Sequence, residues 1–283
     1  AIEPRTKADQ DKLGDALRGL EDEDPSFHVR KDPDSGQTVI WGMGELHLEI
    51  MVDRLQREQG ISCNLGRPQV AYRETVSREI TATGVFEKDL AGKTNFAKVE
   101  LSLAPGAYGT GITFVNEAGP GQVPAEFVPF VAEAAQQACE TGVLAGYPLV
   151  DVAIRLTGGA FAEGESTELG FRNAATSALW DGAKAGEPVL LEPVMSVEVV
   201  APVDYVGDVT GNLNSRRGKV TGMEQRRGDQ VVHAEVPLVE MFGYATQLRS
   251  LSQGRGVFSM QLARYERVPE KIAADITRLY AGA

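Results

Sequence analysis

The stretch Thr6-Lys-Ala-Asp-Gln-Asp-Lys-Leu-Gly-Asp-Ala-Leu-Arg-Gly-Leu20 sets the pattern for the first part of the chain. Thr6 and Asp9 have the spacing of a capping box, in which two side chains satisfy backbone N–H groups at the start of a helix. The acidic run that ends at Pro25 stops the helical pattern. Apolar residues recur between these two signals at helical spacing, at Leu13, Ala16, Leu17 and Leu20. The stretch therefore predicts a helix with one buried face.

One strand is expected before this helix in the sequence, and three strands and a second helix are expected after it. A turn is expected around Pro33–Gly36, and Ile2 with Glu3 reads as the end of an initial strand. The order is then βαββαβ, the ferredoxin-like unit, over residues 1–68. Because the chain begins inside that first strand, we expect it to be a piece of a longer protein. The other strands are expected at Phe27–Val29, Thr38–Trp41 and Ile61–Leu65, and the second helix buries Leu48, Met51, Val52 and Leu55.

The last part of the chain repeats this order over residues 192–268. Pro269 then opens a short helix, residues 269–283, which needs a surface to dock on because a helix of this length is marginal alone. One stripe of it carries Ile272, Ile276 and Leu279. The repeated unit is expected to have strands at Met195–Val200, Lys219–Glu224, Gln230–Pro237 and Val257–Tyr265, and helices at Asp204–Arg216 and Tyr244–Ser252.

Residues 69–191 follow a different pattern, that of an α+β domain. Two loops stand out in it, one near residues 90–97 and one near residues 158–167. Strands are expected at Ile80–Phe86, Val99–Leu103 and Val152–Leu156, and helices at Phe127–Thr141 and Glu168–Ala185. The fold class expected for the whole chain is α+β, and we call residues 1–68, 69–191 and 192–268 the first, middle and third modules.

Composition limits the classes of protein to consider. The 283 residues suffice for two or three domains, and the apolar runs are too short for a transmembrane helix or a signal peptide. Cys63 and Cys139 have no CxxC spacing and suit buried thiols in a reducing compartment, so we expect a cytoplasmic protein that does not contact membranes.

The charge is distributed unevenly along the chain. The net charge is −12, made up of −6 for residues 1–60 (14 acidic, 8 basic), −7 for residues 61–193 (16 acidic, 9 basic) and +1 for residues 194–283 (10 acidic, 11 basic). Bulk attraction to nucleic acid is excluded by this balance. Only the last part, with Arg216-Arg217-Gly-Lys219 and Arg226-Arg227, concentrates positive charge for a polyanion, and exposed turn residues are the alternative explanation.

A catalytic or metal site is not indicated by any motif. Gly92-Lys93-Thr94 lacks the first glycine of a P-loop, because Glu87 stands there, and it precedes an alternating run instead of a helix. His28, His47 and His233 have no partner at ligand spacing, so a hydrogen-bonded structural role is favoured over a metal site. We expect no catalytic residue, no cofactor and no metal in this chain.

Several stretches, in order along the whole chain, closely resemble bacterial translation elongation factor G. They match only domains III, IV and V of that family. The resemblance implies an α+β chain in which a domain resembling domain 2 of ribosomal protein S5 lies between two ferredoxin-like domains, with the C-terminal helix packed on domain IV. The stretches are Ile2-Glu-Pro-Arg-Thr-Lys-Ala-Asp9, Gly42-Met-Gly-Glu-Leu-His-Leu-Glu-Ile50, Gly66-Arg-Pro-Gln-Val-Ala-Tyr-Arg-Glu-Thr75, Gly207-Asp-Val-Thr-Gly-Asn-Leu-Asn-Ser-Arg-Arg-Gly218, Pro237-Leu-Val-Glu-Met-Phe-Gly-Tyr-Ala-Thr246 and Leu248-Arg-Ser-Leu-Ser-Gln-Gly-Arg-Gly256.

The resemblance also implies partners. In the family, domain III relays between the nucleotide domain and the rest, domain V faces the sarcin-ricin loop and stalk base of the ribosome, and the tip of domain IV reaches the tRNA–mRNA duplex at the decoding centre. GTP and Mg²⁺ belong to a family domain that precedes domain III, so this chain is expected to be a monomeric, non-enzymatic part of a GTPase. Its ribosome contacts would be Arg216, Arg217, Lys219 and Arg255 at phosphates, and Lys93, Asn95, Phe96, Glu163 and Ser166 at the tip. For Phe96, anchoring the loop is favoured over stacking on a base.

The tip departs from the family pattern. Where family members carry Gly-Gly-Arg-Gly-Gln-Tyr-Gly, this chain has Ala91-Gly-Lys-Thr-Asn-Phe-Ala97, and the family's Ser-Tyr-His-Glu is replaced by Ala160-Phe-Ala-Glu163. Three hypotheses follow: the C-terminal part of a translocation factor, a paralogue specialised for ribosome recycling, rescue or antibiotic displacement, or a freestanding RNA-binding α+β protein. A full GxxxxGK[ST] motif upstream would separate the first two from the third.

Overall fold

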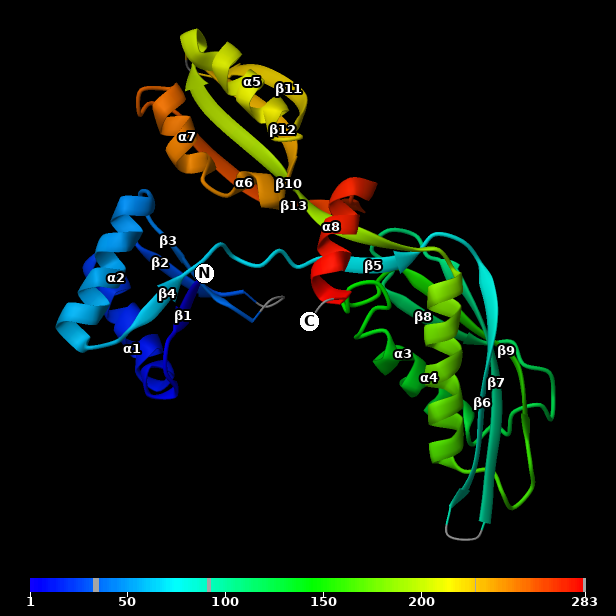
Figure 1. The fold of residues 1–283 in the computed structure, drawn as a ribbon. Coiled ribbons are helices and arrows are strands. Elements are labelled where there is room, and N and C mark those ends of the chain that lie inside the picture. The colour runs from blue at the N-terminus through cyan, green and yellow to red at the C-terminus, as the bar shows by residue number, and fades with distance from the viewer. Residues whose placement is uncertain (33–35, 91–92, 227, 282–283) are drawn as a thin grey trace. The chain divides into compact units, whose positions relative to one another are not determined.

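The computed structural model describes residues 1–283 apart from 33–35, 91–92, 227 and 282–283, so most of the turn expected at Pro33–Gly36 lies outside the described residues (Figure 1). The chain forms two compact units, residues 1–71 with 193–264 and residues 72–192 with 265–283. The expected α+β class is confirmed.

The first module is an antiparallel sheet covered by two helices. Its strands lie in the order β2-β3-β1-β4, the order of a ferredoxin-like βαββαβ unit. The bounds are β1 Ile2–Pro4, α1 Lys7–Glu23, β2 His28–Lys31, β3 Thr38–Trp41, α2 Glu45–Gln59 and β4 Cys63–Leu65.

Helix α1 begins as its sequence predicts. The Asp9 amide donates to Thr6 Oγ1 at 3.2 Å, while the Thr6 hydroxyl donates to the Asp9 carboxylate at 2.7 Å. The stripe predicted to be buried, Leu13, Ala16, Leu17 and Leu20, packs into the core with Phe27 and Leu55. Local capping and one apolar stripe therefore suffice to place α1 on the sheet.

The third module has the same sheet order, β11-β12-β10-β13. Two short helical turns, η1 and α6, are additional to the expected elements. Its core gathers the inward residues of the central strands with Leu213, Tyr244 and Leu248 from the helices. The bounds are β10 Pro188–Pro202, η1 Val203–Tyr205, α5 Val206–Ser215, β11 Lys219–Arg226, β12 Asp229–Pro237, α6 Leu238–Met241, α7 Tyr244–Leu251 and β13 Val257–Arg267.

The middle module is a four-stranded sheet in the order β6-β7-β9-β8, with helices α3 and α4 packed on it. Strands β8 and β9 are parallel and the other pairs are antiparallel. Strand β5 pairs with the first part of β10 instead. The bounds are β5 Arg73–Val76, β6 Ile80–Leu90, β7 Lys93–Pro105, β8 Ile112–Asn116, α3 Val128–Ala138, β9 Val152–Phe161 and α4 Glu168–Ala185.

Both loops expected in the middle module are shorter than predicted. Strand β7 begins at Lys93, so residues 93–97 are strand, and β9 extends to Phe161. The register of β6 with β7 runs unbroken from Ile80↔Leu103 to Leu90↔Lys93. The physical reason is that the alternation of Ala97, Val99 and the residues after them continues toward the turn with Asn95 also buried.

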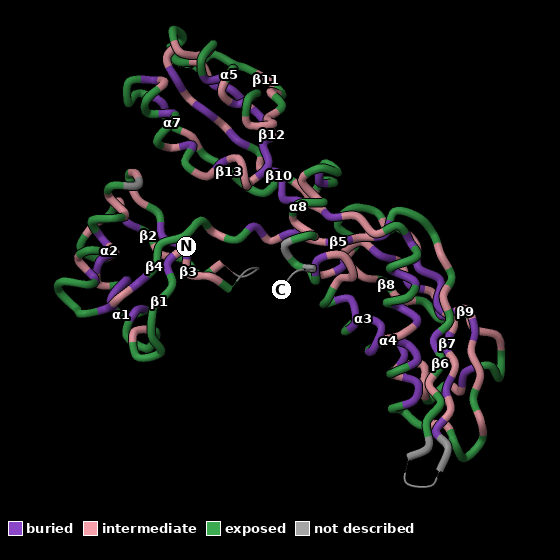
Figure 2. Tube along the Cα trace, in the orientation of Figure 1, coloured by how far each residue is buried: buried purple, intermediate pink, exposed green. Residues whose placement is uncertain are grey.

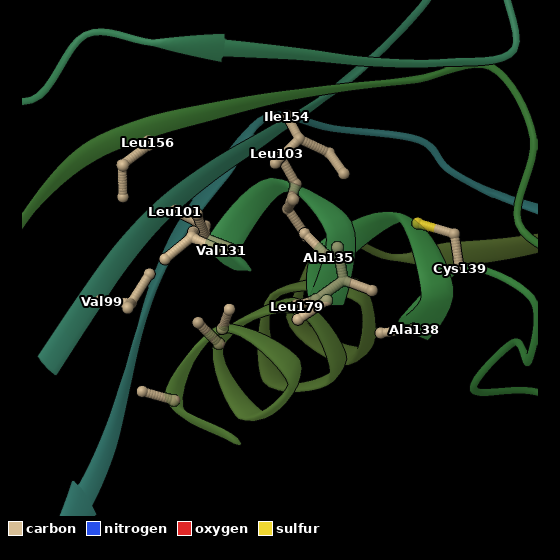
Figure 3. Close-up of a cluster of buried hydrophobic side chains, with 14 of the residues drawn as sticks. Val99, Leu101, Leu103, Val131, Ala135, Ala138, Cys139, Ile154, Leu156 and Leu179 are labelled. Carbon is tan, nitrogen blue, oxygen red and sulfur yellow. The ribbon is translucent and has the colours of Figure 1, made fainter. Parts of the chain in front are cut away.

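Helix α4 packs very closely on the sheet. A methyl group placed on Gly84 of β6 would lie 1.9 Å from the Ala174 carbonyl oxygen of α4, so only glycine fits there. The face of α4 toward the sheet is buried along its length (Figure 2). Apolar side chains from β7, β9, α3 and α4 meet in one cluster, drawn in Figure 3 with Leu101, Ile154, Val131 and Leu179 among those labelled.

Glu74 ties strand β5 to the loop that follows α3. Its side chain is fully buried, and its carboxylate accepts backbone hydrogen bonds from Leu144 (2.9 Å), Ala145 (2.8 Å) and Tyr147 (3.1 Å). Three N–H donors compensate the burial of one charge. The loop is thereby fixed to β5.

The C-terminal helix α8, Glu270–Ala281, docks on the middle module. Tyr280 and Tyr147 hydroxyls are 2.7 Å apart and the rings meet edge to face at 5.1 Å, and Tyr147 also contacts Tyr72. Burial raises the pKa of Tyr147, so the hydroxyl stays protonated as a hydrogen-bond partner.

We expect Glu74→Ala to lower the free energy of unfolding of the middle module by about 3–5 kcal/mol, because each buried N–H donor left without an acceptor costs about 1–3 kcal/mol. Urea unfolding followed by fluorescence of Trp180, which lies in α4, measures this in a Trp41→Phe background. Glu87→Ala, which removes an exposed carboxylate of β6, is the control. Equal midpoints for the two variants would contradict the role assigned to Glu74.

Candidate nucleic-acid interface

The tip of the middle module is made by the β6–β7 hairpin and the loop from β9 to α4. Leu90 pairs with Lys93 as the last register pair of the hairpin, around residues 91–92. The backbone of Lys93 belongs to β7, whereas its side chain lies outside the described residues.

Asn95 is buried at the tip and binds the start of α4. Its Nδ2 donates to Thr167 Oγ1 at 2.6 Å, and Thr167 Oγ1 accepts from the Gly170 amide at 3.2 Å as the N-cap of α4. The side chain is 5% exposed, and Oδ1 has no hydrogen-bond partner among the described residues. The Asn95 side chain is therefore buried and donates to Thr167, the residue that caps α4, and it is not exposed for the expected RNA contact.

Ser166 joins the second loop to the hairpin. Its hydroxyl donates to the Phe96 carbonyl at 2.6 Å and accepts from the Ala162 amide at 2.9 Å. The Phe96 amide in turn donates to the Glu165 carbonyl at 3.4 Å. Ser166 and Phe96 are half-buried, so the structure gives both a part in fixing the tip.

The side chains exposed at the tip are of mixed charge. Glu163 is exposed as expected. Lys88, which was not among the sequence candidates, is exposed opposite Asn95, with its ammonium 5.6 Å from the centre of the Phe86 ring. Pairing the residues of the two strands outward from the turn in the sequence would have placed Lys88 opposite Asn95. Acid, base and aromatic surface together suit contacts to both bases and phosphates.

Arg216 has internal partners in the third module. It ends α5, its Nε donates to Asn212 Oδ1 at 3.0 Å, and its Nη1 donates to the Glu240 carbonyl. Its guanidinium also lies 5.2 Å from the centre of the Tyr244 ring. Burial raises the pKa of Tyr244 to about 12, although Arg216 acts in the opposite direction. The half-buried Arg216 thus joins α5, α6 and α7.

The other three candidate cations differ in exposure. Arg217 is held at a φ of 58° and lies 3.9 Å from the Glu240 carboxylate. Lys219 is exposed at the start of β11, and Arg255 is exposed with its guanidinium over the Tyr205 ring at 4.8 Å and a 2.6 Å hydrogen bond to the Tyr205 hydroxyl. Lys219 and Arg255 are therefore the best placed for a polyanion.

The second basic pair of the third module is Arg226 and Arg227, and Arg226 is held in ion pairs within the module. Arg226 forms ion pairs with Glu224 (2.6 Å) and Glu198 (3.2 Å), while Arg227 lies outside the described residues. The hydrogen bonds to these carboxylates raise the pKa of Arg226 further. The positive charge of Arg226 is therefore neutralised by the two neighbouring carboxylates.

The histidines and acidic side chains of the described part of the chain do not form a metal site. No group of three His, Cys, Asp or Glu side chains there could hold a metal ion. His47 accepts from the Met43 amide at 3.0 Å through Nδ1 and meets Asp24 at 2.9 Å through Nε2, which is the arrangement of a structural histidine. Among the described helices, none combines the length and the apolar character needed to span a bilayer.

Three family models match consecutive parts of the chain. The model of elongation factor G domain III matches residues 1–67, that of elongation factor G domain IV matches residues 68–187, and that of the elongation factor G C-terminus matches residues 189–276. None of these three models is that of a GTPase domain.

A solved structure is similar over the whole length. The crystal structure of ttk003000868 from Thermus thermophilus has a TM-score of 0.87 and 35% sequence identity, and the match covers 100% of this chain. This chain spans 42% of the length of the Thermus protein. The chain belongs to the elongation factor G family, and it comprises domains III and IV and the C-terminal domain of that family.

Proposed function

We propose that this chain is the ribosome-binding part of a translational GTPase and that its middle module promotes movement of tRNA and mRNA during elongation. The observation that carries the proposal is the braced tip, in which Ser166 and Asn95 join the hairpin to the loop before α4. A tip that acts on a moving duplex must resist bending, and hydrogen bonds between its two segments supply that resistance. The family assignment supplies the setting.

The proposed contacts follow from which side chains are exposed. At the tip, Lys88 and Glu163 would meet the tRNA–mRNA duplex at the decoding centre, with Lys93 beside the turn. In the third module, Lys219 and Arg255 would bind phosphates of the sarcin-ricin loop or stalk base. GTP and Mg²⁺ would be bound by another part of the full protein, which would act as a monomer in the cytoplasm.

Force transmission would depend on rigid modules. Hydrolysis elsewhere in the protein biases an equilibrium between arrangements of the modules, and the tip converts that bias into directed movement of tRNA. In the middle module, α4 would transmit force to the tip, because it packs against Gly84 of the sheet and its N-cap, Thr167, lies at the tip.

A second function is favoured by the altered tip sequence. Ala162 stands where the family carries a histidine, and the hairpin keeps only one of the family's four glycines, Gly92, and has Lys93 in place of the arginine. A paralogue that splits ribosomes, rescues them or displaces an antibiotic would need the same docking surface and a different tip.

Ser166→Ala, made in the full-length protein, separates these two functions. Loss of the hydrogen bond to Phe96 loosens the tip, so we expect one round of tRNA translocation to slow by roughly fivefold with unchanged ribosome affinity. Ser177→Ala in α4 is the matched control, since Ser177 contacts only Asp181 through its side chain in the described structure. A slower subunit splitting with recycling factor, at normal translocation, would favour the specialised paralogue.

Lys219→Gln with Arg255→Gln tests the third module. We expect ribosome affinity to fall and the slope of log affinity against log salt to decrease by roughly one to two, because two phosphate contacts are lost. Arg226 is already paired with Glu198 and Glu224, so Arg226→Gln should leave the salt slope unchanged.

Arg216→Ala completes this comparison. We expect it to lower the free energy of unfolding of the third module by about 2 kcal/mol, since it loses charged hydrogen bonds, and to leave the salt slope unchanged. Salt-dependent ribosome binding and urea unfolding measure the two effects. A reduced slope for Arg216→Ala alone would reverse the assignment of roles.

A further inference from the structure

A groove opens on the middle module beside the end of strand β8. It has a volume of about 550 Å³, and we call it the β8–α3 groove. The loop after β8, the first turn of α3 and Phe161 at the end of β9 form its walls. Its lining residues are Asn116, Ala118, Gly119, Pro120, Gly121, Val123, Pro124, Ala125, Val128, Pro129 and Phe161.

The lining of the groove is apolar and contains proline rings and one aromatic ring. Phe161 is 41% exposed, which is unusual for a phenylalanine in a sheet. Pro120, Pro124 and Pro129 contribute rigid ring surfaces. Grooves lined by aromatic side chains are typical binding surfaces for extended peptide segments.

An unpaired strand edge borders the same groove. Strand β8 pairs with β9 from Ile112↔Val152 to Asn116↔Leu156, and the Glu117 amide then donates to the Leu156 carbonyl at 2.9 Å. Strand β9 continues to Phe161, paired with β7 on its other side. Among the described strands, none pairs with Thr157–Phe161 on the β8 side. Such an edge can add one more extended chain.

The charge around the groove is acidic. Residues 99–154 contain neither Lys nor Arg. Glu117 and Glu126 adjoin lining residues of the groove, are exposed, and have no ion-pair partner among the described residues. Glu100 and Glu133 of the same stretch are paired with Lys98 (2.7 Å) and Arg172 (2.5 Å), so the charge beside the groove is that of Glu117 and Glu126. A polyanion is repelled by this surface, whereas a cationic segment is attracted.

We propose that the β8–α3 groove binds an extended, Lys- and Arg-rich polypeptide segment. Its backbone lies along the free edge of β9, an apolar side chain enters between Phe161 and the prolines, and its cations pair with Glu117 and Glu126. Proteins that coat RNA carry basic tails of this kind, so the basic tail of an RNA-bound protein is the source to which we commit. Only that choice of source rests on the proposed function.

Binding of a dye-labelled peptide of alternating Lys and Val residues to the 283-residue chain, followed by fluorescence anisotropy, tests the inference. We expect Glu117→Gln with Glu126→Gln to raise the Kd about tenfold at low salt, with a smaller effect at high salt. Glu87→Gln with Glu140→Gln removes the same charge from exposed sites outside the lining and should leave the Kd unchanged. Phe161→Ala, checked for folding by Trp180 fluorescence, should also raise the Kd about tenfold.

Any of the following results would overturn the proposal. The first is equal binding of a peptide in which every Lys is replaced by Glu, or equal effects of the two double variants. The second is displacement of the peptide by a single-stranded RNA oligonucleotide whose own binding requires Phe161. The third is a dimer in sedimentation velocity that Phe161→Ala abolishes, since a second copy would then occupy the groove. The assay contains no ribosome, so its failure is distinct from failure of the ribosome-binding measurements.

Discussion

The close approach of helix α4 to strand β6 is the constraint on which the middle module depends. At Gly84 the helix backbone takes the space that any side chain would need, and Gly182 meets Leu103 of β7 in the same way farther along. Contact at this distance lets the small residues of α4 bury the whole helix face against the sheet. The position of α4 along the sheet then fixes where its N-cap, Thr167, stands. Asn95 reaches Thr167 only because both positions are set by this packing.

The tip is therefore an extension of the core. Asn95 and Ser166 form hydrogen bonds with the helix cap and with backbone groups of the tip. In an ordinary loop these groups would be hydrogen-bonded to water. The contacts Asn95–Thr167 and Ser166–Phe96 span 72 and 70 residues of sequence, so the two segments are ordered together. What remains free to meet a partner is a small set of exposed side chains, with Lys88 and Glu163 among them. Precision at the tip comes from the buried side chains, and recognition comes from the exposed ones.

The sequence predicted the three modules because their signals are local. Capping at Thr6, the apolar stripe of α1 and the repeated βαββαβ order depend on residues within a few turns of one another. Residues 93–97 were predicted to lie in a loop but belong to β7, and strand β8 was missed because its residues are mostly exposed. The roles of Asn95 and Arg216 could not be predicted, since their partners Thr167 and Tyr244 become neighbours only in the fold. Burial of a polar residue is decided by such distant partners.

The distribution of charge shows how an acidic chain could bind the RNA partner that we propose. With screening over about 8 Å at physiological salt, a phosphate responds to the side chains beside it and hardly to the net charge of −12. Within the middle module the basic residues Lys88, Lys93 and Lys98 lie on the β6–β7 hairpin, whereas the base-free segment from residue 99 to 154 forms β8, α3 and their loops. The hairpin is therefore of mixed charge, whereas every charged residue of that segment is acidic. An RNA held at the tip is steered away from the β8–α3 groove, which stays available to a cationic chain.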